Sequence, residues 1–248
     1  MLVWRFTGAW LAGLVIAAGG TGAPSRRASG PPGDPLARRT LVIGQSTQGR
    51  PITAVAVGDL DETARTLVIG VIHGDEPAGR AIARRLAHGP LPRSSALWII
   101  ESVNPDGMAA DRRQNARGVD LNRNFPWRWR PLGRRGDQQY SGRHALSEPE
   151  SRAAYGLIRK LRPQVTIWFH QPLHVTDLSG GDARVERRFA AISGLPPRRL
   201  VRYPGSAASW QNHALPKSTA FVVELGPGNP SRAALVRTAR GVYAIAGG

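Results

Sequence analysis

Four short segments of this 248-residue chain are apolar at nearly every position, and stretches with a helical pattern of apolar residues separate them. The segments cover residues 66–72, 96–103, 165–169 and 219–225. Strands that are apolar on both faces are typical of a parallel sheet that is covered on both sides. Their alternation with helices predicts an α/β fold with a mixed, largely parallel central sheet flanked by helices on both faces.

The remaining elements are predicted from turn residues and from apolar periodicity. Strands are predicted at residues 40–43 and 52–57, which would lie together at an edge of the sheet, and a short strand at 199–203. Helices are predicted at residues 77–89, 147–162, 182–192 and 231–246. Residues 108–142 show no clear period, and a connection that long in a compact domain is usually functional.

The amino terminus has the pattern of a secretory signal peptide. Arg5 precedes an apolar stretch at residues 10–18, and small residues follow up to Ala23. We expect residues 1–23 to be a signal peptide that directs a secreted or extracytoplasmic location. An uncleaved anchor is the alternative, but the apolar core is shorter than the roughly 20 residues of a spanning helix.

The rest of the chain is long enough for one domain with a sizeable core. Residues 24–39 are rich in Pro, Gly, Ser and Arg and have few apolar side chains, so we expect a flexible leader. Residues 40–248 are then predicted to form a single catalytic domain.

The chain carries a formal net charge of +17, and almost all of its positive charge is arginine. Lys160 and Lys217 are the only lysines. A basic surface suits an anionic partner such as an envelope polymer. Because the arginines are dispersed and no platform of aromatic and basic residues is present, we expect no nucleic-acid partner, and compositional bias is the simplest interpretation of the charge.

Candidate metal ligands follow the predicted buried strands. His73 and Glu76 come directly after the first strand, and His170 closes the third. Ligands in such sheets bind beyond the carboxyl ends of the strands. The chain contains no cysteine, so any metal must lie on histidines and carboxylates, and two histidines with one glutamate are a common ligand set of catalytic zinc.

The sequence leaves alternatives for Glu76, His170 and a further candidate, Glu224. Glu76 could cap the helix that begins near Pro77, and His174 competes with His170 for the position of third ligand. Glu224 lies in an apolar strand, where a carboxylate is costly unless it has a partner. It could form an ion pair with an arginine or act as a general base whose pKa is raised by burial.

Several motifs together resemble the zinc metallocarboxypeptidase family. The resemblance covers residues 40–225 and is most specific in the segment Gly118-Val119-Asp120-Leu121-Asn122-Arg123-Asn124-Phe125-Pro126. Other matching motifs are Gly44-Gln45-Ser46, Gly49-Arg50-Pro51-Ile52, His73-Gly74-Asp75-Glu76, Asn104-Pro105-Asp106-Gly107, Gly205-Ser206 and Ser209-Trp210.

The resemblance implies a role for each matching residue. One Zn²⁺ ion would be bound by His73, Glu76 and His170, and Glu224 would be the catalytic base. Arg113 would polarise the scissile carbonyl group. Asn122 and Arg123 would bind the free carboxylate of the substrate. Tyr203 would be the family's mobile tyrosine, and Ala208 would lie in a roomy specificity pocket.

The short catalytic domain and the sequence His170-Gln171-Pro172-Leu173 are more similar to bacterial murein peptide amidases than to digestive carboxypeptidases. This similarity implies hydrolysis of the bond between γ-D-glutamate and diaminopimelate in murein peptides. The alternatives are a general carboxypeptidase acting on protein C-termini, a deacylase of small N-acyl amino acids and an inactive envelope-binding module. No obligate protein partner is evident in the sequence.

Overall fold

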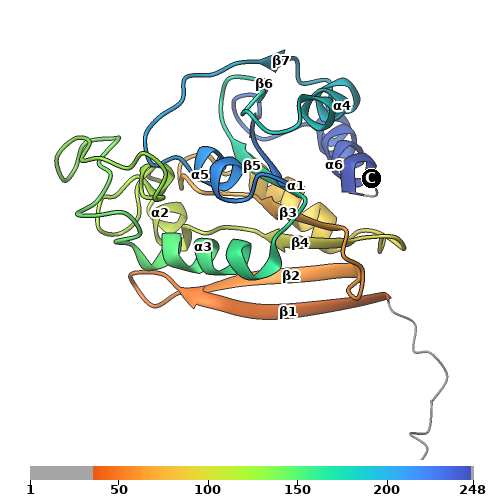
Figure 1. Cartoon of the computed structure of the whole chain (residues 1–248), viewed down its shortest axis with the longest axis horizontal. Helices are drawn as coiled ribbons and strands as arrows, with labels where there is room; N and C mark the ends of the chain where they lie inside the picture. Colours follow the sequence, from red (N-terminus) through yellow and green to blue (C-terminus); the bar gives the residue numbers. More distant parts are fainter. Residues whose placement is uncertain (1–35, 247–248) are drawn as a thin grey trace, which may run out of the picture. The chain divides into compact units, whose positions relative to one another are not determined.

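A computed structural model describes residues 36–246 of the chain, which form a mixed sheet with helices on both faces (Figure 1). The strands are β1 (Leu36–Gln45), β2 (Pro51–Asp59), β3 (Arg65–Ile69), β4 (Ala96–Ile100), β5 (Val165–His170), β6 (Val175–Asp177), β7 (Pro197–Arg198) and β8 (Thr219–Glu224). The helices are α1 (Ala78–Ala87), α2 (Pro105–Ala109), the 3₁₀ helix η1 (Leu121–Arg123), α3 (Pro149–Leu161), α4 (Ala183–Ser193), α5 (Ala207–Ala214) and α6 (Arg232–Ala246). The predicted signal peptide at residues 1–23 and residues 24–35 of the predicted leader lie outside the described residues.

The strand order in the sheet is β1-β2-β4-β3-β5-β8-β6-β7. The four central strands β4, β3, β5 and β8 are parallel to one another. The pairs β1–β2, β2–β4 and β6–β8 are antiparallel, and the short edge pair β6–β7 is parallel. These four strands are the segments that are apolar on both faces. The predicted fold class, a mixed and largely parallel sheet, is therefore confirmed.

Helices α1, α4 and α6 cover one face of the sheet, and α3 and α5 cover the other. Neighbouring residues of β5 show why both faces must be covered. Phe169 packs into the core beneath α1, α4 and α6, and Trp168 packs into the core beneath α3 and α5. Each is no more than 1% exposed. Within the described part of the chain, no helix combines the length and the apolar character needed to cross a bilayer.

One predicted boundary and one predicted strand are wrong. Residues 36–39 belong to β1 instead of the leader, because the main chain of this edge strand pairs with β2 from Leu36 onward and needs no apolar side chains. Residues 199–203 do not form a strand. The strand of this segment is β7, which ends at Arg198 and pairs with β6. Beyond it, the main-chain N–H of Leu200 donates to the side-chain carboxylate of Asp177 (2.9 Å) instead of to another strand.

Asp106 connects the β1–β2 turn to the start of α2. Its buried carboxylate accepts hydrogen bonds from Ser46 Oγ (2.8 Å), the Gln48 N–H (2.9 Å) and Arg50 Nη1 (2.6 Å). Burial by itself raises the pKa of the Asp106 carboxyl, but these three hydrogen bonds outweigh it, and the pKa lies below the ordinary value. The ionised carboxylate therefore stabilises the folded state.

We predict that Asp106→Asn lowers the free energy of unfolding at pH 7 by about 1–3 kcal/mol, because the neutral amide cannot accept the same charge-assisted bonds. A carboxyl group with a lowered pKa contributes stability above its unfolded pKa, and the contribution is lost as the pH falls through its folded pKa. The difference from wild type should therefore shrink below about pH 4. Urea unfolding at pH 7 and pH 3 tests this, with the exposed Asp61→Asn as control. An equal difference at both pH values would contradict it.

Candidate active site

The candidate site lies at the carboxyl ends of three central strands. His73 and Glu76 lie between β3 and α1, while His170 and Glu224 are the last residues of β5 and β8. The register of the sheet places His170 directly beside Glu224. Gly74 lets this loop approach α2 closely, because a Cβ atom at this position would lie 2.0 Å from the main-chain carbon of Gly107.

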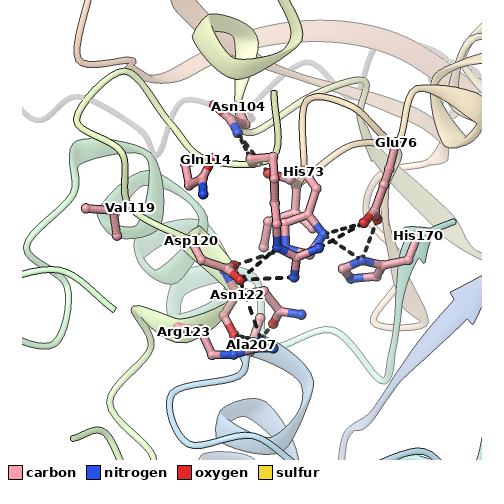
Figure 2. Close-up of polar contacts among 12 residues, drawn as sticks. His73, Glu76, Asn104, Gln114, Val119, Asp120, Asn122, Arg123, His170 and Ala207 are labelled. Atoms are coloured by element: carbon pink, nitrogen blue, oxygen red, sulfur yellow. Dashed lines mark hydrogen bonds and ion pairs between the residues drawn. The ribbon is translucent and has the colours of Figure 1, made fainter. Parts of the chain in front are cut away.

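Three potential metal ligands meet at this point. His73 Nδ1 lies 3.0 Å from Glu76 Oε1, His170 Nδ1 lies 2.9 Å from Glu76 Oε2, and the two Nδ1 atoms are 3.1 Å apart (Figure 2). Across residues 36–246, no other group of three or more His, Cys, Asp or Glu side chains could hold a metal ion. His174, which the sequence left as an alternative, is an exposed residue outside this group.

Asp120 orients the first of these histidines. His73 Nε2 lies 3.0 Å from Asp120 Oδ1, and the Asp120 side chain is fully buried. Because an ionised carboxylate can only accept hydrogen bonds, His73 must carry its proton on Nε2. The other ring nitrogen, Nδ1, faces Glu76 and His170 and is the atom available to a metal ion.

The electrostatics of this cluster favour a cation. Burial raises the pKa of the Glu76 carboxyl, but the neighbouring His73 and His170 outweigh this effect and hold the pKa far below its usual range. The carboxyl of Asp120 is likewise kept ionised against burial, mainly by His73 and Arg113. Burial lowers the pKa of His73, whereas Asp120 and Glu76 raise it to a value above the ordinary one. Two ionised carboxylates therefore face two imidazole rings in a buried space.

Glu224 faces the same cleft from β8. Its Oε2 atom is buried and has no hydrogen-bond partner among the described residues. Burial raises the pKa of the Glu224 carboxyl; His170 lowers it and Glu76 raises it, and the net pKa is above the ordinary value. The ion pair with an arginine, which was the structural alternative for Glu224, is absent from the described part of the chain. A half-buried carboxylate with a raised pKa and one unpaired oxygen atom suits a group that accepts and returns a proton.

Arg113 belongs to the 108–142 segment and contacts one of the candidate ligands. Its Nε and Nη2 atoms each donate to Asp120 Oδ2 at 3.0 Å, and its Nη1 atom donates to Glu76 Oε1 at 3.1 Å. Asp120 thus contacts both a candidate ligand and a guanidinium group (Figure 2).

Asn122 and Arg123 are positioned by the same short helix, η1. Asn122 Oδ1 accepts the Ala207 N–H (3.0 Å), and the NH₂ group of Asn122 has no hydrogen-bond partner within residues 36–246. The Arg123 side chain is 4% exposed, and its Nε atom is buried without a partner among the described residues. A buried guanidinium with an unused N–H group is a site for an anion.

Tyr203 and Ala208 line the same cleft, whose volume is about 410 Å³. The ring of Tyr203 lies over the Arg123 guanidinium, with Arg123 Cζ 4.0 Å from the ring centre. Ala208 is buried in the first turn of α5 and presents only a methyl group. All nine site residues predicted from the sequence therefore line one cleft.

Comparisons with known proteins agree with this geometry. The zinc carboxypeptidase family matches residues 34–176, which is more than half of the chain. The chain belongs to this family. Murein peptide amidase A of Escherichia coli K12 is 29% identical over 199 residues, which cover 75% of this chain and 79% of the amidase. Carboxypeptidase SOL1 of Arabidopsis thaliana is 31% identical over 148 residues, and these cover 53% of this chain but only 28% of SOL1.

A solved structure has the same architecture. The murein-tripeptide amidase MpaA of Escherichia coli O157 superposes with a TM-score of 0.69 at 27% identity, over 86% of this chain and 96% of the amidase chain. Membership of the zinc carboxypeptidase family makes the chain a zinc metallopeptidase.

The donor atoms fit the zinc of this family. Two imidazole nitrogens and one ionised carboxylate form the His₂Glu set of catalytic zinc sites. The two Nδ1 atoms lie 3.1 Å apart and each faces an oxygen of Glu76, so one cation can bind all three groups. The Asp120–His73 contact adds the carboxylate–histidine pair that usually accompanies a zinc ligand.

Sequence reasoning assigned no role to Asp120, although it lies in the most specific motif. Its partner His73 is 47 residues away, and no local pattern reveals such a contact. Asn104 was read only as part of a turn. Its side-chain Nδ2 donates to the main-chain oxygens of Ile72 (3.0 Å) and Arg113 (3.2 Å), and so joins the loop of Arg113 to the loop of His73.

We predict that Asp120→Asn lowers the affinity for Zn²⁺ by about 10- to 100-fold, because His73 loses the carboxylate that orients its ring. Competition with a chromophoric chelator at pH 7 measures the affinity. Asp137→Asn, which changes an exposed carboxylate in the same segment, is the matched control and should bind zinc like wild type. Equal affinities of wild type and Asp120→Asn would contradict the orienting role.

Proposed function

We propose that the protein is an exported zinc peptidase that hydrolyses an amide bond next to a residue with a free carboxylate, in murein peptides. The observation that carries the proposal is that the candidate metal ligands, base and carboxylate-binding residues line the same cleft. The cleft is lined by the His73–Glu76–His170 cluster. It is also lined by Glu224 and Arg123, each of which has a buried polar atom without a partner among the described residues. Export rests on the signal-peptide pattern of residues 1–23.

The proposed cofactor is one Zn²⁺ ion bound by His73 Nδ1, His170 Nδ1 and the carboxylate of Glu76. Zinc in such a site acts as a Lewis acid on the carbonyl group and lowers the pKa of water to about 7.

The side chains of the protein then have separate tasks. Glu224 accepts a proton from the attacking water through its free Oε2 atom and returns it to the leaving amine, which a raised pKa favours. Arg113 donates a hydrogen bond to the carbonyl oxygen as negative charge develops there. Asn122 and Arg123 hold the free carboxylate of the residue that leaves, and this contact fixes which bond lies beside Glu224.

Two considerations support murein peptides as the substrate. The chain covers most of the length of Escherichia coli murein peptide amidase A and of the solved MpaA chain. An exported enzyme with a net charge of +17 also meets an anionic wall polymer favourably. Carboxypeptidase action on protein C-termini is the second candidate, because the carboxylate site alone would accept such substrates equally well.

We predict that Glu224→Gln retains zinc but loses about 10²- to 10⁴-fold in kcat, since the amide cannot accept the proton of the attacking water. Metal content by mass spectrometry and turnover of one peptide substrate measure the two effects. Glu62→Gln, at an exposed turn, is the control. A Glu224→Gln protein with full zinc content and full turnover would show that Glu224 is not the base.

The substrate class is tested by incubating the zinc-loaded enzyme with the tripeptide L-Ala-γ-D-Glu-meso-diaminopimelate and with peptides that differ in their C-terminal residue. We predict release of free diaminopimelate as the dominant reaction, because the cleft is proposed to recognise a wall residue. Mass spectrometry identifies the products. Release of ordinary C-terminal residues alone would contradict the murein proposal and favour a general carboxypeptidase.

A further inference from the structure

The wall of the cleft carries a cation that the mechanism above does not use. Arg202 lines the cleft and its side chain is 38% exposed. Its Nη1 atom donates to Asp177 Oδ2 (2.7 Å) and to the main-chain oxygen of Leu200 (3.0 Å), and its Nη2 atom donates to the main-chain oxygen of Leu178. The guanidinium group is therefore fixed against the wall.

Asp177 is the anchor of this arrangement. The Asp177 residue is 2% exposed, and its carboxylate also accepts the Leu200 N–H (2.9 Å) and the Ser179 hydroxyl (2.6 Å). A guanidinium group has five N–H donors, and the contacts above use three of those of Arg202. The Nε–H group and one Nη2–H group have no partner among the described residues and are available to an anion in the cleft.

Arg202 lines the same cleft as the proposed site for the substrate carboxylate. The next residue, Tyr203, lies over the guanidinium of Arg123 with a distance of 4.0 Å between Arg123 Cζ and the ring centre. Ala208 and Val222 line the same cleft with small or apolar side chains. A substrate residue held at Arg123 by its own carboxylate therefore shares the cleft with the small or apolar side chains of Ala208 and Val222 and with a second fixed guanidinium, that of Arg202.

We infer that Arg202, fixed by Asp177, selects the side chain of the released residue, and that it selects a side chain that ends in a carboxylate. The inference rests on the proposed peptidase function. The residue meso-diaminopimelate has a carboxylate at the far end of its side chain, and L-lysine is the same residue without that group. A planar guanidinium binds a carboxylate through two parallel hydrogen bonds, so the two residues differ by one charge-assisted contact.

Three synthetic peptides of the form L-Ala-γ-D-Glu-X separate this role from others. X is meso-diaminopimelate, L-2-aminopimelate, which keeps the distal carboxylate and lacks the distal amine, or L-lysine, which keeps only the amine. For the zinc-loaded wild-type enzyme we expect kcat/KM to be about 10- to 100-fold higher for the two peptides with the distal carboxylate than for the lysine peptide.

Arg202→Met should reduce this preference to less than about threefold, because methionine retains an apolar stem but no charge. Arg199→Met is the matched control, since Arg199 is an exposed arginine of the same segment that does not line the cleft. The control should keep the wild-type preference. Thermal unfolding of each variant reports whether the segment is still folded; if Arg202→Met is unfolded, the three wild-type rates decide.

Each contrary outcome has a separate meaning. Equal wild-type rates on all three peptides would overturn the role of Arg202 and leave the peptidase proposal standing. An Arg202→Met enzyme that loses activity equally on all three, with the preference kept, would show that Arg202 only holds the segment in place and would also overturn the inference. Cleavage of none of the three would refute the murein function, and with it the inference.

Discussion

The buried carboxylate of Asp120 links the two functions that this cleft must combine. One of its oxygen atoms contacts Nε2 of the candidate ligand His73, and the other accepts two hydrogen bonds from Arg113. A carboxylate without exposure is costly unless its lone pairs are satisfied, and here charged or polar donors satisfy them. The candidate ligand His73 and the segment proposed to bind the substrate are therefore coupled through one side chain.

The sheet provides the frame for this contact. Parallel strands β3, β5 and β8 end at the same edge, so a residue after β3, the last residue of β5 and the last residue of β8 come together. The register between β5 and β8 places His170 beside Glu224 without any contribution from loops. The loops then add the arginines. Strands thus place His170 and Glu224, while the β3–α1 connection places His73 and Glu76. The guanidinium groups of Arg113, Arg123 and Arg202 come from segments outside the sheet that polar contacts hold in place.

The parts that could be predicted from sequence were those with a local cause. Strand β5 was predictable because a segment buried on both faces must be apolar throughout, and its last residue His170 then marks the edge of the sheet. Helix α1 was predictable from Ala78, Ile82 and Leu86 on one face.

The parts that could not be predicted depend on contacts between distant polar groups. The link between Asp120 and His73 and the anchor of Arg202 on Asp177 leave no periodic pattern in the chain. Residues 36–39 were assigned to the leader because edge-strand pairing uses the main chain, which composition does not reveal. Family motifs identified the residues of the cleft, but the order in which they contact one another required the structure.

The most direct measurement of the central claim is X-ray absorption at the zinc edge on protein loaded with one equivalent of Zn²⁺, together with the same spectrum of Asp120→Asn. The account predicts coordination by two imidazole nitrogens and a carboxylate oxygen in the wild type, with increased disorder of one imidazole in the variant. A zinc environment without two imidazoles, or one that is identical in both proteins, would contradict the arrangement in which Asp120 orients His73 toward Glu76 and His170.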